Sequence, residues 1–152
     1  MKINIRKGVF ETNSSSMHSI SISSNDHFNF YDKPIIGRFG EFGWGYDELV
    51  TPEEKLSYVL TAIQYYDDGI NENNITDSTY YIWLNEMIKD YTGHEIDLRI
   101  NYNDFYPLGY IDHQSVDTLD DFWSQDKETF KENMKELIFN QKYRIIIDND
   151  NH

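Results

Sequence analysis

The sequence predicts a single α+β domain with a mostly antiparallel sheet packed by about three helices. Its length of 152 residues is enough for one domain with its own core. Short apolar–polar alternations lie near both ends of the chain, and helical apolar periodicity dominates the middle. Strands thus precede and follow paired helices, which is typical of α+β folds. We place the domain at 1–147 and expect residues 148–152 to form a frayed acidic tail.

Four segments have the pattern of sheet strands. Residues 2–7, 17–23 and 95–103 alternate apolar and polar side chains, whereas 142–147 is a β-branched run typical of a buried strand. The connection between 2–7 and 17–23 is too short for a parallel crossover, so we expect these two to pair antiparallel. Between them and the first helix, four glycines and four aromatics alternate over residues 37–46. This segment is either a lid over a pocket or a stretch that packs its rings onto the sheet.

Three helices are expected at 52–67, 78–91 and 127–140. The first begins with a strong signal: Thr51 as N-cap, Pro52 at the first helical position and Glu54 completing a capping box. Apolar residues recur along one face of each helix. Three leucines on these faces are expected in the core: Leu60, Leu84 and Leu137.

The composition excludes several classes of protein. There is no cysteine, which rules out disulfides, thiolate metal sites and cysteine nucleophiles. No apolar run approaches the roughly 20 residues of a membrane span, and the first residues resemble a strand rather than a signal peptide. The five histidines form no metal-binding motif. We therefore expect a protein of the host-cell cytoplasm that has no cofactor, no metal and no membrane contact.

Charge is the strongest global feature, with 27 acidic against 13 basic side chains and a formal net charge of -14. Such a chain repels nucleic acid and is attracted to basic surfaces. The excess of acidic side chains either keeps the protein soluble or lets it occupy the basic nucleic-acid groove of a partner. Candidate partner-binding residues are Trp44, Trp123, Asp47 and Glu48. The wider candidate acidic face comprises Glu41, Asp47, Glu48, Glu53, Glu54, Asp67, Asp68, Asp117, Asp120 and Asp121.

A polar segment between the first two predicted strands is the candidate ligand site. If the protein is an enzyme, His18 and His113 are its candidate catalytic pair, one imidazole as base and one as acid on a phosphodiester. Two-His phosphoesterases carry His-x-Ser or His-x-Thr twice; His113-Gln-Ser115 fits this pattern and His18-Ser-Ile20 does not. The alternative is that each histidine satisfies backbone groups at a strand end. Candidate ligand-binding residues are Arg6, Glu11, Thr12, Asn13, Ser14, Ser15, Ser16, Ser19, Asp112 and Ser115.

Parts of the chain resemble an uncharacterised family of small proteins from bacteriophages and Gram-positive mobile elements. The resemblance is carried by the opening string Gly8-Val-Phe-Glu-Thr-Asn-Ser-Ser-Ser-Met-His18-Ser19 and by three shorter pieces. These are Glu41-Phe-Gly-Trp44, Lys55-Leu-Ser-Tyr58 and Ile111-Asp-His-Gln-Ser115. The resemblance implies a phage-type setting and no particular reaction.

Three functions follow as hypotheses. The first is an inhibitor that binds a host defence or nucleic-acid enzyme, such as a CRISPR effector, through that enzyme's basic surface and without contacting nucleic acid itself. The alternative is a small nucleotide- or phosphodiester-binding protein or hydrolase that uses the His18/His113 site. The third is a phage accessory protein without a pocket. The sequence identifies neither the partner nor the oligomeric state, and we expect binding rather than catalysis.

Overall fold

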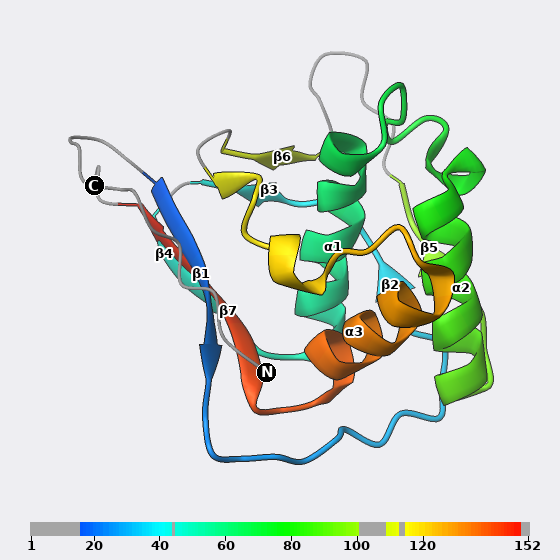
Figure 1. The fold of residues 1–152 in the computed structure, drawn as a ribbon, viewed down its shortest axis with the longest axis horizontal. Coiled ribbons are helices and arrows are strands. Elements are labelled where there is room, and N and C mark those ends of the chain that lie inside the picture. The colour runs from blue at the N-terminus through cyan, green and yellow to red at the C-terminus, as the bar shows by residue number, and fades with distance from the viewer. Residues whose placement is uncertain (1–15, 44, 101–108, 113–114, 150–152) are drawn as a thin grey trace.

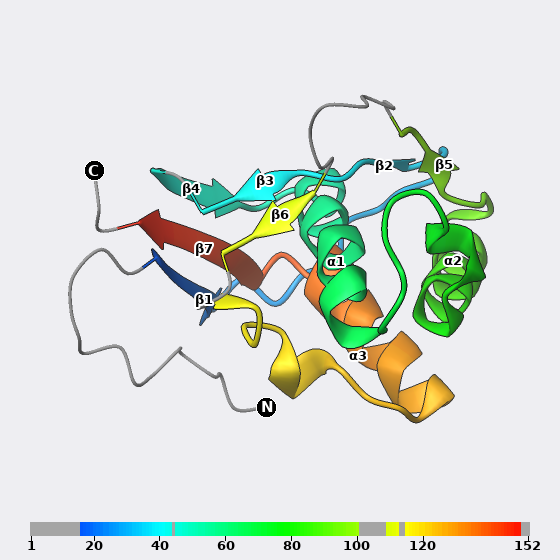
Figure 2. The same cartoon turned by 90° about the horizontal axis from the view of Figure 1, so that it is seen from above.

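The computed structural model describes residues 16–43, 45–100, 109–112 and 115–149, and it has the predicted α+β class. Figure 1 shows a twisted sheet on one side of the molecule and three helices on the other. Seen from above, α1 lies between the sheet and α2 (Figure 2). The strand expected at 2–7, and with it the expected antiparallel hairpin, lies outside the described residues.

The main sheet has the order β1–β7–β4 and is antiparallel throughout. It consists of β1 (Ser16–Ile22), β7 (Tyr143–Asn149) and β4 (Tyr46–Leu49). Ile20, Ile145 and Leu49 lie in register across the three strands and are buried. Because side chains alternate along a strand, the neighbouring positions face away from the helices and are half-buried or exposed. β7 ends two residues later than expected, because Asp148 and Asn149 pair with the start of β1.

The three helices are α1 (Pro52–Tyr66), α2 (Thr79–Thr92) and α3 (Lys127–Phe139). The predicted capping box is present, with the Thr51 and Glu54 side chains each accepting from the other's backbone N–H. Gly93 ends α2 in the left-handed conformation, at φ 84°, that glycine adopts without steric cost. The predicted core leucines Leu60, Leu84 and Leu137 are each fully buried. Short 3₁₀ helices lie at Ile75–Asp77 and Asp120–Phe122.

Two short parallel ladders lie beside the main sheet. β2 (Ile36–Gly37) pairs with β5 (Asp97–Leu98), and β3 (Glu41–Phe42) pairs with β6 (Tyr110–Ile111). The expectation that the segment 95–103 joins the main antiparallel sheet is therefore wrong for its described part, 95–100; residues 101–103 lie outside the described residues. Gly37 permits the pairing with β2, since a Cβ there would lie 2.7 Å from a methyl carbon of Ile96. The missing side chain lets this segment approach β2 closely.

The glycine–aromatic segment 37–46 is part of the packed structure. It contains β3 and the ends of two other short strands, and Phe39 and Phe42 pack partly buried against the core. Two of its rings, Phe39 and Phe42, thus pack on the domain, whereas Tyr46 is exposed and residues of the segment also line a groove described below. None of the described helices is both long enough and apolar enough to cross a bilayer.

Candidate functional site

The structure places some of the predicted site residues and leaves others outside the described residues. Described are His18 and Ser19 on β1, Asp112 after β6, and Ser115; Ser16 begins β1. Outside them lie Arg6, Glu11, Thr12, Asn13, Ser14, Ser15, Trp44 and His113.

His18 lies on the inner face of β1 and is completely buried. Its Nδ1 lies 2.8 Å from the phenol oxygen of Tyr58 on α1, and the two rings meet edge to face. Ser19 is half-buried, and its position in the alternation places it on the opposite face of the sheet. The structure therefore separates Ser19 from His18, although they are adjacent in sequence.

The Asp112–Ser115 segment comes close to the same aromatic pair. The backbone N–H of Asp112 donates to the carbonyl of Phe42 at 3.1 Å, and the Phe42 ring lies 4.9 Å from the Tyr58 ring. The N–H of Ser115 donates in turn to the carbonyl of Asp112 at 2.8 Å, and Ser115 is fully buried. The segment leading to Ser115 is thus bonded to the backbone of Phe42, and the Phe42 ring contacts Tyr58, the partner of His18.

The chemistry open to this buried polar cluster is limited by its burial. Tyr58 is 1% exposed and His18 and Ser115 are 0% exposed, so a substrate reaches the imidazole only by displacing side chains that cover it. Buried polar groups of this kind need hydrogen-bond partners, and the phenol supplies one to the imidazole. In the part of the chain that the structure describes, no cluster of three or more His, Asp or Glu side chains is placed to hold a metal ion.

A groove with an acidic lining lies beside the N-terminus of α1 and adjoins this buried cluster at Phe42. It is bounded by β4, by residues 36–42 and by the first two turns of α1, and its volume is about 350 Å³. Its lining carries four carboxylates and one guanidinium over an apolar floor. The lining residues of this acidic groove are Ile36, Arg38, Gly40, Glu41, Phe42, Asp47, Leu49, Glu53, Glu54 and Ser57.

The four carboxylates of the acidic groove differ in their partners. Glu53 accepts from the Tyr31 hydroxyl at 3.0 Å and from a backbone N–H at 3.2 Å; burial and this carboxylate raise the pKa of Tyr31 to about 12. Glu54 accepts the N–H groups of residues 50 and 51 as part of the helix cap. Glu41 and Asp47 are exposed. They are therefore the carboxylates best placed to meet an incoming cation.

The candidate acidic face divides into two groups at opposite ends of α1. The first is the acidic groove at the N-terminus, with Glu48 on the neighbouring strand. The second follows the C-terminus, where the Tyr66 hydroxyl donates to Asp120 and the pKa of Tyr66 is raised by burial and by this carboxylate. A helix of 15 residues separates the two groups by roughly 20 Å. The second group, called the C-terminal acidic group below, comprises Asp67, Asp68, Asp117, Asp120 and Asp121.

Trp123, a candidate partner anchor, packs within the domain. Its indole stacks on the Tyr66 ring at 3.9 Å between centroids and meets Tyr80 and Phe130 edge to face. It is half-buried, so a partner would contact only part of its surface. Among the described residues the most exposed large apolar side chains are instead Phe30, at 85%, and Tyr46, at 60%.

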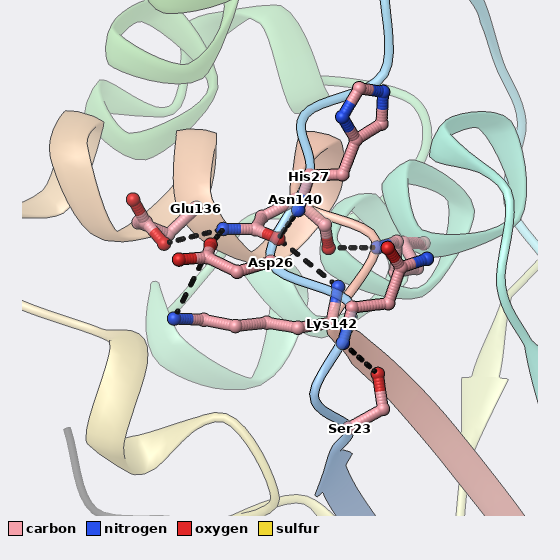
Figure 3. Close-up of polar contacts among 8 residues, drawn as sticks. Ser23, Asp26, His27, Glu136, Asn140 and Lys142 are labelled. Carbon is pink, nitrogen blue, oxygen red and sulfur yellow. Dashed lines mark hydrogen bonds and ion pairs between the residues drawn. The ribbon is translucent and has the colours of Figure 1, made fainter.

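Asn140, which the sequence did not single out, forms a polar junction that joins three segments of the chain (Figure 3). Its side-chain oxygen accepts from the N–H groups of His27 and Lys142, and its amide nitrogen donates to Asp26 and Glu136. The residue is 1% exposed, and its amide thus makes two bonds as acceptor and two as donor. It fixes the connection after β1 against the turn between α3 and β7.

Lys55 is the second functional group that sequence reasoning missed. It is fully buried, and its Nζ donates to the carbonyl oxygens of Tyr143 at 2.9 Å and Asn140 at 3.3 Å. Burial lowers the pKa of this amine to about 7. One signal was present in the sequence: Lys55 precedes Val59 by four residues and so lies on the apolar face of α1.

No family model, curated protein sequence or solved structure matches the chain.

Proposed function

We propose that the protein acts by binding: it is an acidic inhibitor that occupies the basic, nucleic-acid-contacting surface of a host enzyme. The observation that carries this proposal is the acidic groove, in which four carboxylates face one guanidinium around a hollow of about 350 Å³. The net charge of -14 points the same way, because it favours association with basic surfaces and disfavours nucleic acid and anionic membranes.

The acidic groove suits the side chain of a lysine or arginine. Such side chains combine a cationic head with an aliphatic stem that covers apolar surface. Glu41 and Asp47 would receive the head at the mouth of the groove, while the floor of Ile36, Phe42 and Leu49 would contact the stem. Tyr46 is exposed on β4, but the alternation of the strand places it on the face opposite Asp47 and Leu49, so it lies outside the groove.

The C-terminal acidic group extends this charge along the molecule. Its carboxylates lie where the partial negative charge of the α1 dipole already accumulates, so their potentials add. A nucleic-acid-binding enzyme presents basic residues along a groove rather than at one point. Two acidic groups roughly 20 Å apart on one helix match such an extended surface better than a single group would. The partner we propose is a host enzyme with such a surface, for example a CRISPR effector, in keeping with the phage-type setting expected from the sequence.

The experiment is capture of partners from bacterial host lysate on the immobilised protein, with elution by salt and by a short DNA duplex. Partners that leave under both conditions support occupation of a nucleic-acid surface, because exposed charge pairs weaken as the screening length falls to about 8 Å near physiological ionic strength. Capture that resists both would indicate an inhibitor that binds elsewhere on its target. Absence of any partner would remove the support for a binding function.

A matched pair of variants localises the contact. Glu41→Lys with Asp47→Lys reverses the two exposed charges of the acidic groove and should abolish capture. Asp90→Lys with Glu128→Lys makes the same change in net charge on exposed positions of α2 and α3 and should retain it. Equal loss of capture by both double variants would show that net charge alone, and not the groove, drives association.

The alternative, a nucleotide- or phosphodiester-binding site, is supported by an indirect link between the two motifs through the contact of the Phe42 and Tyr58 rings. His18 contacts Tyr58, and the segment leading to Ser115 contacts Phe42. Complete burial of His18 is the observation against it. A screen of nucleotides and cyclic oligonucleotides for turnover and for a rise in melting temperature separates the possibilities. Turnover supports a hydrolase, stabilisation alone supports a ligand-binding protein, and neither leaves His18 as a core residue.

A further inference from the structure

Lys55 occupies an unusual place for a lysine, because its amine lies inside the domain. The side chain leaves α1 and reaches the junction between α3 and β7, where two backbone carbonyls accept its N–H groups. Within the described residues, no carboxylate oxygen lies within ion-pair distance of this amine. A buried charge without a paired counter-charge is strongly disfavoured, and lysines in such places become neutral instead.

The hydrogen bonds agree with a neutral amine. An uncharged amine has two N–H groups, and Lys55 meets two acceptors, the carbonyls of Asn140 and Tyr143. An ammonium has three N–H groups, and the third would need an acceptor that the described junction does not supply. Water would have to enter to satisfy it.

The surrounding charges do not give the protonated amine a net electrostatic stabilisation. From β7, Arg144 repels the protonated form, whereas Glu54 on α1 attracts it. The other charged groups at this junction, Asp26, Glu136 and Lys142, gather around the side chain of Asn140 and not at its carbonyl. Burial is the largest effect, and together these place the pKa of Lys55 at about 7.

We propose that Lys55 is a pH-sensitive lock in which the neutral amine holds α1 against the α3–β7 junction and protonation opens this junction to water. Because Lys55 shares its helical turn with Glu53 and Glu54, the opening acts on one wall of the acidic groove. The proposal does not depend on the proposed function, since it concerns the protonation state of one buried amine.

Linkage gives the sign of the effect. The folded-state pKa lies below the unfolded value of 10.5, so between about pH 7 and 10 the unfolded chain binds one more proton than the folded chain. The folded state therefore gains stability as pH rises, and the unfolding constant falls about tenfold for each pH unit. The range from about pH 8 to 9.5 is favourable for this test, because the chain has no cysteine and ordinary tyrosines and lysines titrate higher.

The first experiment is denaturant unfolding at pH 7, 8, 9 and 9.5 for the wild type, Lys55→Met and Lys89→Met. Lys89 is exposed on α2 and serves as the matched control. The wild type and K89M should show the tenfold dependence per pH unit, whereas K55M should lack it and be more stable than the wild type at pH 7. Parallel pH dependence in the wild type and K55M would overturn the proposal.

Two measurements on the wild type test the lock even if K55M fails to fold. The ¹³Cε and ¹⁵Nζ resonances of Lys55 should titrate near pH 7, and titration near 10.5 would show that the amine is charged. The N–H of Tyr143 donates to the Asn140 carbonyl, so its protection from hydrogen exchange should fall up to tenfold between pH 8 and 6. The N–H of Gly93, which donates a hydrogen bond to the carbonyl of Lys89, is the control and should keep its protection from exchange. Equal protection of Tyr143 at both pH values would exclude opening of the junction.

Discussion

His18 and Tyr58, forty positions apart in the sequence, meet in the core with Nδ1 2.8 Å from the phenol oxygen. This pair ties β1 to α1, and both side chains are almost fully buried. His18, which the sequence suggests as a catalytic candidate because hydroxyl side chains neighbour it, is thus a hydrogen-bonded polar residue of the core. The Phe42 ring packs against Tyr58, and the backbone N–H of Asp112 donates to the carbonyl of Phe42, so the two motifs are linked indirectly.

Tyr58→Phe should destabilise the fold by about 1–3 kcal/mol, because it removes a hydroxyl from a buried imidazole and leaves that nitrogen without this partner. The measurement is the midpoint of denaturant unfolding. Tyr46→Phe is the control, since the Tyr46 hydroxyl binds Glu48 on the exposed face, and its effect should stay within about 0.5 kcal/mol. Equal midpoints for Y58F and the wild type would show that the His18–Tyr58 bond contributes nothing to stability.

Leu→Ala at any of Leu60, Leu84 and Leu137 should destabilise by roughly 2–5 kcal/mol, because each lies at 0% exposure on a packed helix face and its truncation leaves a cavity. Ile82→Ala on the exposed side of α2 is the matched control, at 46% exposure, and should cost much less. Unfolding midpoints measure both. Wild-type midpoints for two of the three leucine variants would contradict the packing of these faces.

Asn140→Asp should destabilise by about 2–4 kcal/mol at pH 7, because a carboxylate replaces an amide that donates to Asp26 and Glu136. The new carboxyl group would be protonated more readily in the folded state than in the unfolded state. Its folded-state pKa is therefore raised, and the stability relative to wild type is lost as pH rises past about 4. Thermal melts at pH 4 and 7 test this, with exposed Asn71→Asp as the control. A deficit of equal size at both pH values would refute the charge argument.

The helices could be predicted from sequence because their signals are local. Thr51, Pro52 and Glu54 act within one turn, and the leucine faces follow from a period of 3.6 residues. The pairing of the short ladders could not: the alternation over 95–103 predicts a strand but not its partner, and the β2–β5 pair involves the close approach at Gly37. The pairing partner of a segment is a property of the whole fold.

The candidate sites show the same division. The four carboxylates of the acidic groove come from residues 41–54, so their proximity was accessible from sequence once a turn was assumed. Lys55 and Asn140 were missed because a pattern analysis assigns charged and amide side chains to the surface. Their acceptors and donors lie far along the chain, and only the folded structure brings them together.

Stability should also fall on the alkaline side, above about pH 10. Burial, with Glu53, raises the pKa of Tyr31 to about 12, and burial likewise raises the pKa of Tyr66. Because these folded-state values exceed the unfolded value of 10, the folded chain keeps protons that the unfolded chain loses, and its stability declines as pH rises. Unfolding at pH 10, 10.5 and 11, above the range in which Lys55 adds stability, measures the decline. Tyr31→Phe should make it shallower than in the wild type, and an unchanged slope would contradict the shift at Tyr31.

Asp68→Lys should stabilise the protein by about 0.3–1 kcal/mol, because it places a cation just beyond the C-terminus of α1, where the helix dipole favours positive charge. The last turn of α1 carries no basic residue, and the C-terminal acidic group adds further negative charge there. The gain should shrink in 1 M salt, where the screening length is about 3 Å. Asp68→Asn separates the two parts of the effect, since it removes the carboxylate without adding a cation and should give a smaller gain. Asp68 is exposed, so neither variant disturbs packing. A loss of stability in both variants at low salt would show that the carboxylates at this end of α1 are held by interactions other than the dipole.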